Sequence, residues 1–147
     1  MSWTASSGPV VTGANLPPNG LVTTTAKATV GNPMVSVATG PTPMVTVVGT
    51  AGGGSGSTVT LRFPRRLGTF QLAGPYVFGM GGVDTTATAA YSPAGRPAGV
   101  SYKASSGTIV VNSIAANKYS GTFDFFVVDG GNARAVAISQ GIFDANQ

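Results

Sequence analysis

Glycine, proline and β-branched residues recur so densely in this chain that no stretch of ten residues suits an uninterrupted α-helix. The 147 residues include 22 glycines and 10 prolines, and valine and threonine fill much of the sequence between them. Proline removes a backbone donor and glycine lowers helix stability, whereas β-branched side chains fit extended strands. The sequence therefore predicts an all-β protein.

Turn-forming clusters divide the chain into short extended segments, and Asp129-Gly130-Gly131-Asn132 is the clearest hairpin signal. Such punctuation is typical of antiparallel architectures, so we expect an all-β fold, an antiparallel β-sandwich or barrel of about ten short strands. The expected strands cover residues 21–30, 34–39, 44–50, 58–63, 68–73, 86–91, 100–104, 108–114, 118–128 and 133–143.

The first part of the chain is rich in Gly, Pro and Thr and has weak strand patterning. We expect residues 1–20 to form an N-terminal arm and residues 21–147 to form a single β-sandwich domain. No run approaches the roughly 18 apolar residues of a membrane helix, so no transmembrane segment is predicted.

Period-2 alternation is clearest in residues 118–128. Phe123 and Phe125 project to one face of this expected strand, and Phe126 and Val128 project to the other. A strand that is apolar on both sides is either central in a covered sheet or buried against a partner. The predicted core anchors are Phe70, Ile109, Phe123, Phe125 and Phe143.

The chain lacks the side chains that most enzymes and metal sites use. It has no cysteine, no histidine and no glutamate, and its acidic residues are Asp84, Asp124, Asp129 and Asp144. Histidine is the usual acid–base group near neutral pH, and cysteine and histidine are the usual zinc ligands. The four aspartates show neither the spacing of a calcium loop nor a paired-carboxylate motif. We therefore expect a protein that is not an enzyme and has no cofactor.

Arg62, Arg65 and Arg66 form the one cluster of basic residues, and the net charge is +4. They are the candidate contacts for an anion. Nucleic-acid binding usually needs a broader basic stripe interleaved with aromatic residues, so we do not expect nucleic acid as a partner.

A set of short motifs in the second half of the chain resembles an uncharacterised family of small β-domain proteins from Bacteroidota. The motifs are Gly68-Thr69-Phe70-Gln71-Leu72, Tyr91, Ser106-Gly107-Thr108-Ile109-Val110-Val111, Lys118-Tyr119-Ser120-Gly121-Thr122-Phe123-Asp124-Phe125 and Val136-Ala137-Ile138-Ser139-Gln140-Gly141-Ile142-Phe143. The resemblance spans about residues 44–145. It implies a β fold and export or lipid anchoring. It implies no activity, and therefore no functional residues to transfer.

Sparse charge favours a role in self-association. Charged residues make up 8% of the chain, against roughly 25% in ordinary globular domains. We expect a structural or self-assembling subunit at the cell surface or outside the cell, a homo-oligomer that associates through β edges and apolar faces. The candidate assembly edges are Leu21, Val22, Val35, Val37, Val45 and Val47.

The alternative function is a carbohydrate- or small-ligand-binding module, with a glycan as the partner. Aromatic side chains exposed on a sheet could stack on sugar rings. The candidates are Trp3, Tyr76, Tyr91, Tyr102 and Tyr119.

Overall fold

The computed structural model describes residues 1–9, 24–52, 56–72, 87–95, 101–129 and 134–147. These residues form ten strands, all paired antiparallel, and contain no helix. The expected all-β antiparallel fold is therefore confirmed, as one curled sheet in the form of a half-barrel. The strands are β1 (Ser2–Pro9), β2 (Thr24–Thr29), β3 (Met34–Ala38), β4 (Met44–Thr50), β5 (Thr58–Pro64), β6 (Gly68–Gln71), β7 (Thr88–Ser92), β8 (Tyr102–Ala115), β9 (Lys118–Asp129) and β10 (Arg134–Asn146).

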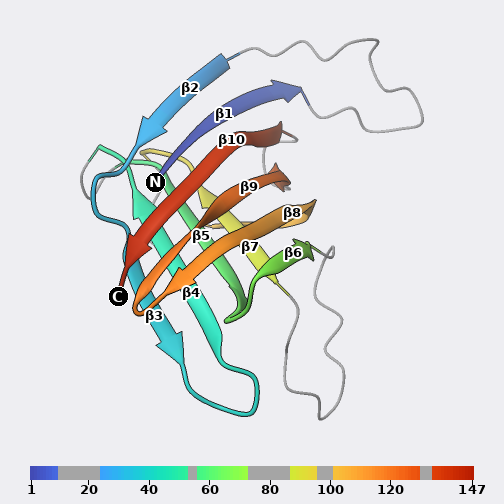
Figure 1. Cartoon of the computed structure of the whole chain (residues 1–147). Helices are drawn as coiled ribbons and strands as arrows, with labels where there is room; N and C mark the ends of the chain where they lie inside the picture. The colour runs from blue at the N-terminus through green and yellow to red at the C-terminus, as the bar shows by residue number, and fades with distance from the viewer. Residues whose placement is uncertain (10–23, 53–55, 73–86, 96–100, 130–133) are drawn as a thin grey trace.

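The sheet follows the order β2-β1-β10-β9-β8-β7-β5-β4-β3, and β6 pairs with β8 beside this path. In Figure 1 the long strands β8, β9 and β10 cross in front of β3, β4 and β5. Strand β8 belongs to both layers, since Tyr102 and Lys103 pair with β7 and the stretch from Thr108 to Val111 pairs with β6. The two layers are thus continuous through β8.

Irregularities in the long strands accompany the curling of the sheet. The register shifts between Ala104 and Ser106 in β8, and again between Ile138 and Gly141 in β10. Bulges of this kind bend a strand and increase its twist. Gly107 follows the first bulge with a φ of 139°, a conformation that only glycine adopts readily. A curled sheet rather than two separate sheets follows from these bends.

The core lies between the two layers and is made by alternate residues of each strand. Val45 and Val47 of β4 and Leu61 and Phe63 of β5 have no exposed surface. They face a second set of buried side chains from β1, β8, β9 and β10. All five residues predicted as core anchors belong to this cluster: Phe70, Ile109, Phe123, Phe125 and Phe143.

The first strand differs from the expectation of an N-terminal arm. β1 pairs with β10 on one side and β2 on the other, and Trp3 and Ala5 are buried in the core. The burial of a single large indole at this position binds the segment to the sheet, although its other residues are small or polar. The rest of the expected arm, residues 10–20, lies outside the described residues.

Two strands that the sequence separated are one in the structure. Residues 100–104 and 108–114 were expected as two strands joined by a turn at 105–107, but β8 runs through all of these positions from Tyr102 onward. Ser105 and Ser106 form a bulge opposite Phe126 instead of a turn. The count of ten strands is preserved because β1 is added where these two merge.

Gly121 is expected to be intolerant of any side chain. A Cβ at this position would overlap the Val110 carbonyl oxygen and the ring of Phe143. We predict that Gly121→Ala destabilises the protein by about 3 kcal/mol, as overpacking of a rigid core does. Gly40→Ala is the matched control, since beyond its two chain neighbours no described atom lies within 4 Å of the added Cβ. Urea unfolding of both variants measures the difference, and equal midpoints would contradict this packing.

Candidate functional site

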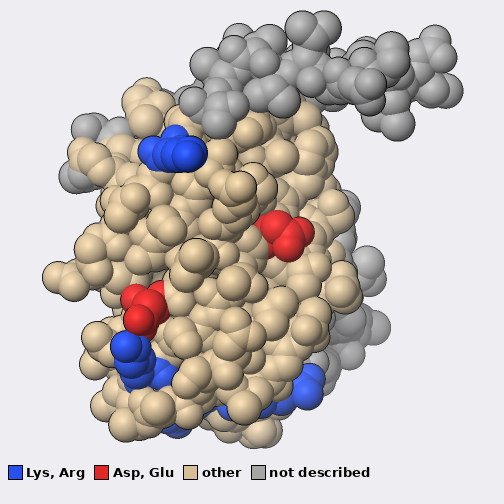
Figure 2. Space-filling model, turned by 45° about the horizontal axis from the view of Figure 1, so that its top comes forward, with Lys and Arg blue, Asp and Glu red and all other residues tan. Residues whose placement is uncertain are grey.

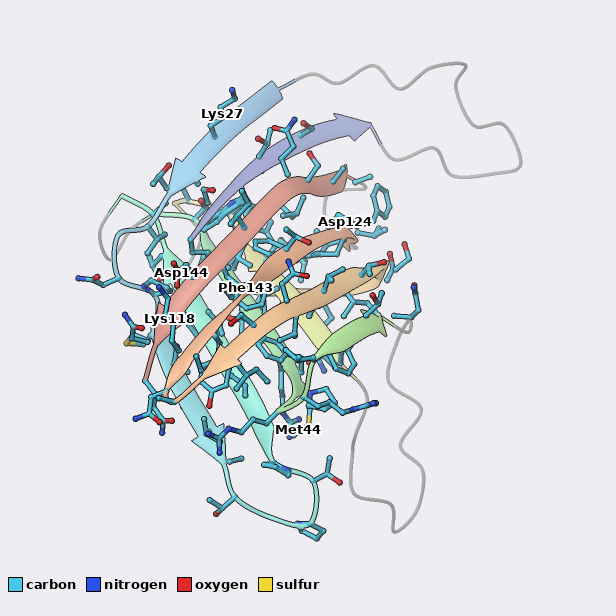
Figure 3. All side chains as sticks on the ribbon, viewed as in Figure 1. Lys27, Met44, Lys118, Asp124, Phe143 and Asp144 are labelled. Atoms are coloured by element: carbon cyan, nitrogen blue, oxygen red, sulfur yellow. The ribbon has the colours of Figure 1, made fainter. Side chains whose placement is uncertain are left out.

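The two ends of the sheet path, β2 and β3, are the candidate interaction edges. β2 carries Lys27, which is exposed and points away from the sheet in Figure 3. β3 has the sequence MVSVA and no charged residue. A lysine on an edge strand discourages pairing with another chain, because pairing would bring its charge against a neighbouring backbone. The described part of the sheet therefore has one edge with a charge and one without.

β3 is paired with β4 alone in the described part of the chain. β10 approaches β3 near the C-terminus in Figure 1, but no ladder joins them. Val35 and Val37 face inward and are half-buried against the core, whereas Met34, Ser36 and Ala38 face outward and are exposed. Met34 is 71% exposed. As far as the described residues show, this edge leaves a row of unpaired backbone groups and an uncharged outer face open to a partner.

The other predicted edge residues lie elsewhere. Val45 and Val47 belong to β4, which pairs with both β3 and β5, so the prediction of an edge at this strand is wrong. Both side chains are completely buried, because β4 lies one strand in from the edge and contributes its valines to the core. Leu21 and Val22 lie outside the described residues.

An apolar patch lies on the outer face of β9. It consists of Phe126 and Val128, which are 37% and 43% exposed. Ile142 of β10 is 55% exposed, but it pairs with Thr122 and lies apart from this patch. β9 is paired with β8 and β10, so it is a central strand, yet no other strand that the structure describes covers its outer face. Figure 2 shows that most of the surface on the side of the molecule drawn there is uncharged. This patch is the second candidate contact surface.

The carboxylates that the structure describes are dispersed. Asp124 is exposed on the outer face of β9, and Asp144 of β10 pairs with Lys118 at 3.1 Å (Figure 3). Asp84 lies outside the described residues, and Asp129 is the last residue of β9. Within the described residues no three His, Cys, Asp or Glu side chains gather in a group that could hold a metal ion.

The three predicted anion contacts lie at one end of β5 but differ in setting. Arg62 is half-buried within the strand, whereas Arg65 and Arg66 are exposed in the turn that follows it. The Arg65 guanidinium lies 5.9 Å from the centre of the Tyr119 ring, and that of Arg66 lies 5.2 Å from the Phe70 ring. Figure 2 shows Lys and Arg side chains along one margin of the molecule. Arg65 and Arg66 thus lie together in one exposed turn, and Arg62 lies in the strand before it.

Most of the aromatic candidates for a glycan platform are inside the protein. Trp3, Tyr91 and Tyr119 are at most 7% exposed, Tyr102 is half-buried, and Tyr76 lies outside the described residues. Burial raises the pKa of Tyr91, and a side-chain hydrogen bond with Ser57 partly offsets this increase. The Trp3 Nε1 and the Tyr119 hydroxyl are buried and have no hydrogen-bond partner among the residues that the structure describes. These rings serve the core rather than a stacking surface.

The fold and these surfaces describe an antiparallel half-barrel with an apolar interior, one uncharged edge and a basic turn. The chain belongs to the family described as Domain of unknown function (DUF6252), which matches residues 34–145. No match was found among curated proteins or among solved structures. No helix in the described residues is long and apolar enough to cross a membrane.

Two buried tyrosines should respond in opposite ways to loss of their hydroxyl groups. The Tyr119 hydroxyl is buried without a partner, so we predict that Tyr119→Phe stabilises the protein by about 1 kcal/mol. Tyr91 has its hydrogen bond with Ser57, so Tyr91→Phe should cost about 1 kcal/mol. Chemical denaturation of the two variants provides the comparison. Destabilisation by Tyr119→Phe would mean that its hydroxyl has a partner, such as a buried water molecule.

Proposed function

We propose that this domain is a non-catalytic structural subunit that associates with copies of itself through β3, as part of a filament, surface layer or shell outside the cytoplasm. The observation that carries the proposal is the uncharged, singly paired edge of β3. A strand edge is satisfied most completely by another strand, and an uncharged edge has no side chain that opposes such pairing.

The sequence of β3 suits pairing with itself. In an antiparallel pair with Ser36 on a two-fold axis, Met34 lies opposite Ala38 of the second copy, and Val35 lies opposite Val37. Each copy then presents a valine to a valine on the inner face and places no charge against charge. Such an isologous contact joins two half-barrels through one continuous sheet.

The apolar patch supplies a second and separate contact surface. Phe126 and Val128 lie on the outer face of β9, which is separated from β3 by several strands of the sheet. An isologous edge contact alone closes as a dimer, whereas a second contact through another surface extends the assembly. A filament or layer therefore follows from the use of both surfaces together.

Location outside the cytoplasm has two supports. A surface with few charges offers little repulsion between copies at high local density, which suits a subunit that has to pack. The resemblance to small exported β-domain proteins points in the same direction. Fractionation of the native cells, with the protein measured in each fraction, tests this part of the proposal separately.

Ser36→Lys is the variant that tests the edge contact. Ser36 is exposed, so the change should leave the fold intact. In the two-fold pair it would set two ammonium groups directly opposite one another, which destabilises a cross-strand pair. We predict at least a tenfold rise in the dissociation constant of the homo-oligomer, measured by size-exclusion chromatography with light scattering.

Asn112→Lys is the matched control, because Asn112 is exposed on β8 and the substitution adds the same charge away from β3. It should leave the oligomeric state unchanged. A wild-type chain that remains strictly monomeric at high micromolar concentration contradicts the proposal, as does an equal effect of the two lysines.

A further inference from the structure

The turn between β5 and β6 carries two arginines and an exposed leucine in succession. We call Arg65, Arg66 and Leu67 the basic tip. Its backbone is held by two short hydrogen bonds: the Arg65 N–H donates to the Pro43 carbonyl oxygen at 2.8 Å, and the Arg66 N–H donates to that of Pro64 at 2.7 Å. The tip is thus joined to the β3–β4 connection and has a defined shape.

Aromatic rings, and not carboxylates, hold the two arginine side chains of the basic tip. Arg65 lies over Tyr119 and also donates from Nη2 to the Ala116 carbonyl oxygen at 3.4 Å, and Arg66 lies over Phe70. Of the described carboxylates, none forms an ion pair with either guanidinium. The Asp144 carboxylate pairs with Lys118 at 3.1 Å. Both guanidinium charges are therefore positioned by aromatic rings, and no carboxylate among the described residues neutralises them.

Leu67 is 59% exposed beside these two charges. Unlike Phe126, Val128 and Ile142, it lies in a turn at one end of a strand and not on the face of the sheet. An apolar side chain next to cations at an exposed turn matches the chemistry of a lipid interface, where apolar groups enter the acyl boundary and cations meet phosphate.

We infer that the basic tip is a contact site for the surface of an anionic lipid bilayer. The guanidinium groups of Arg65 and Arg66 donate hydrogen bonds to lipid phosphate oxygens, for which the planar fork of arginine is well shaped, while the Leu67 side chain enters the interface. A soluble polyanion would engage the arginines and leave Leu67 in water. The exposed leucine therefore favours a bilayer over a polyanion. This contact uses a different surface from the β3 edge and does not depend on self-association.

Co-sedimentation of the full chain with vesicles tests the inference. We expect binding to vesicles of phosphatidylcholine mixed with phosphatidylglycerol, and at least fivefold less to phosphatidylcholine alone. Because cation–phosphate attraction is screened by salt, binding should weaken as salt rises from about 0.05 to about 0.5 M. Equal binding to both vesicle types, or to neither, overturns the inference.

Matched variants separate the contributions of charge and of the leucine. Arg66→Ser and Lys27→Ser remove one positive charge each, from the tip and from β2 respectively. We expect the first to lower the vesicle partition coefficient at least fivefold and the second less than twofold. Leu67→Ser should lower it to a similar degree, and Leu67→Met should retain it. Thermal melts of each variant confirm that it is folded, and equal effects of Arg66→Ser and Lys27→Ser would overturn the assignment to the tip.

A tryptophan at position 67 reports insertion directly. The native Trp3 is the one tryptophan of the chain and is 2% exposed, so brominated lipids should quench the added fluorophore of Leu67→Trp and leave wild type unaffected. Absence of quenching overturns the inference. Binding of a soluble sulfated polysaccharide that is weakened by Arg66→Ser but not by Leu67→Ser also overturns the inference. The arginines would then be a polyanion site.

Discussion

The contact between Phe63 and Phe143 joins the two layers of the curled sheet. Phe63 comes from β5 and Phe143 from β10, and their ring centres are 5.4 Å apart. Phe123 of β9 extends this contact, with its ring centre 6.5 Å from that of Phe143. Gly121 leaves the space in which the Phe143 ring lies. The layers are continuous through β8, but this aromatic packing fixes how closely they approach and which side of every strand faces the core.

The outer surface of the sheet is mostly uncharged because the chain has few charged residues. Once alternate residues are directed inward, the outward positions are mainly threonine, serine, alanine and valine, and few lysines remain to guard edges or faces. β2 carries a lysine, Lys27, whereas β3 has no charged residue. The basic tip gathers two more cations where the turn after β5 meets aromatic rings of β6 and β9. Among the described residues, charged side chains are thus sparse outside this turn, and much of the remaining surface is left for apolar or backbone contacts (Figure 2).

The two proposals use this division in different ways. Association through β3 depends on the absence of charge along a strand edge, so it should change little with salt. Contact of the basic tip with a bilayer depends on guanidinium charge and should weaken with salt. Because the two surfaces share no residue, the loss of one contact leaves the other to be observed independently. A subunit that used both would assemble beside a membrane surface.

The sequence by itself determined the strand content, the inward face of the long strands and the aromatic core, since local propensity and period-2 alternation depend only on neighbouring residues. It also located Arg62, Arg65 and Arg66 in one cluster. Leu67 lies outside that cluster, although an isolated apolar residue directly after two arginines is itself a signal in the sequence. The alternation of Val45 and Val47 is the same in an edge strand as in a central one, so the sequence could not place β4 inside the sheet. Apart from Met1, Trp3 is the single large apolar residue in the first eight, which made β1 resemble an arm. Only the tertiary structure decided these points. The number of neighbouring strands that a strand has depends on pairing between residues far apart in the chain, such as Ala5 with Ile138. No local sequence pattern encodes such long-range pairing.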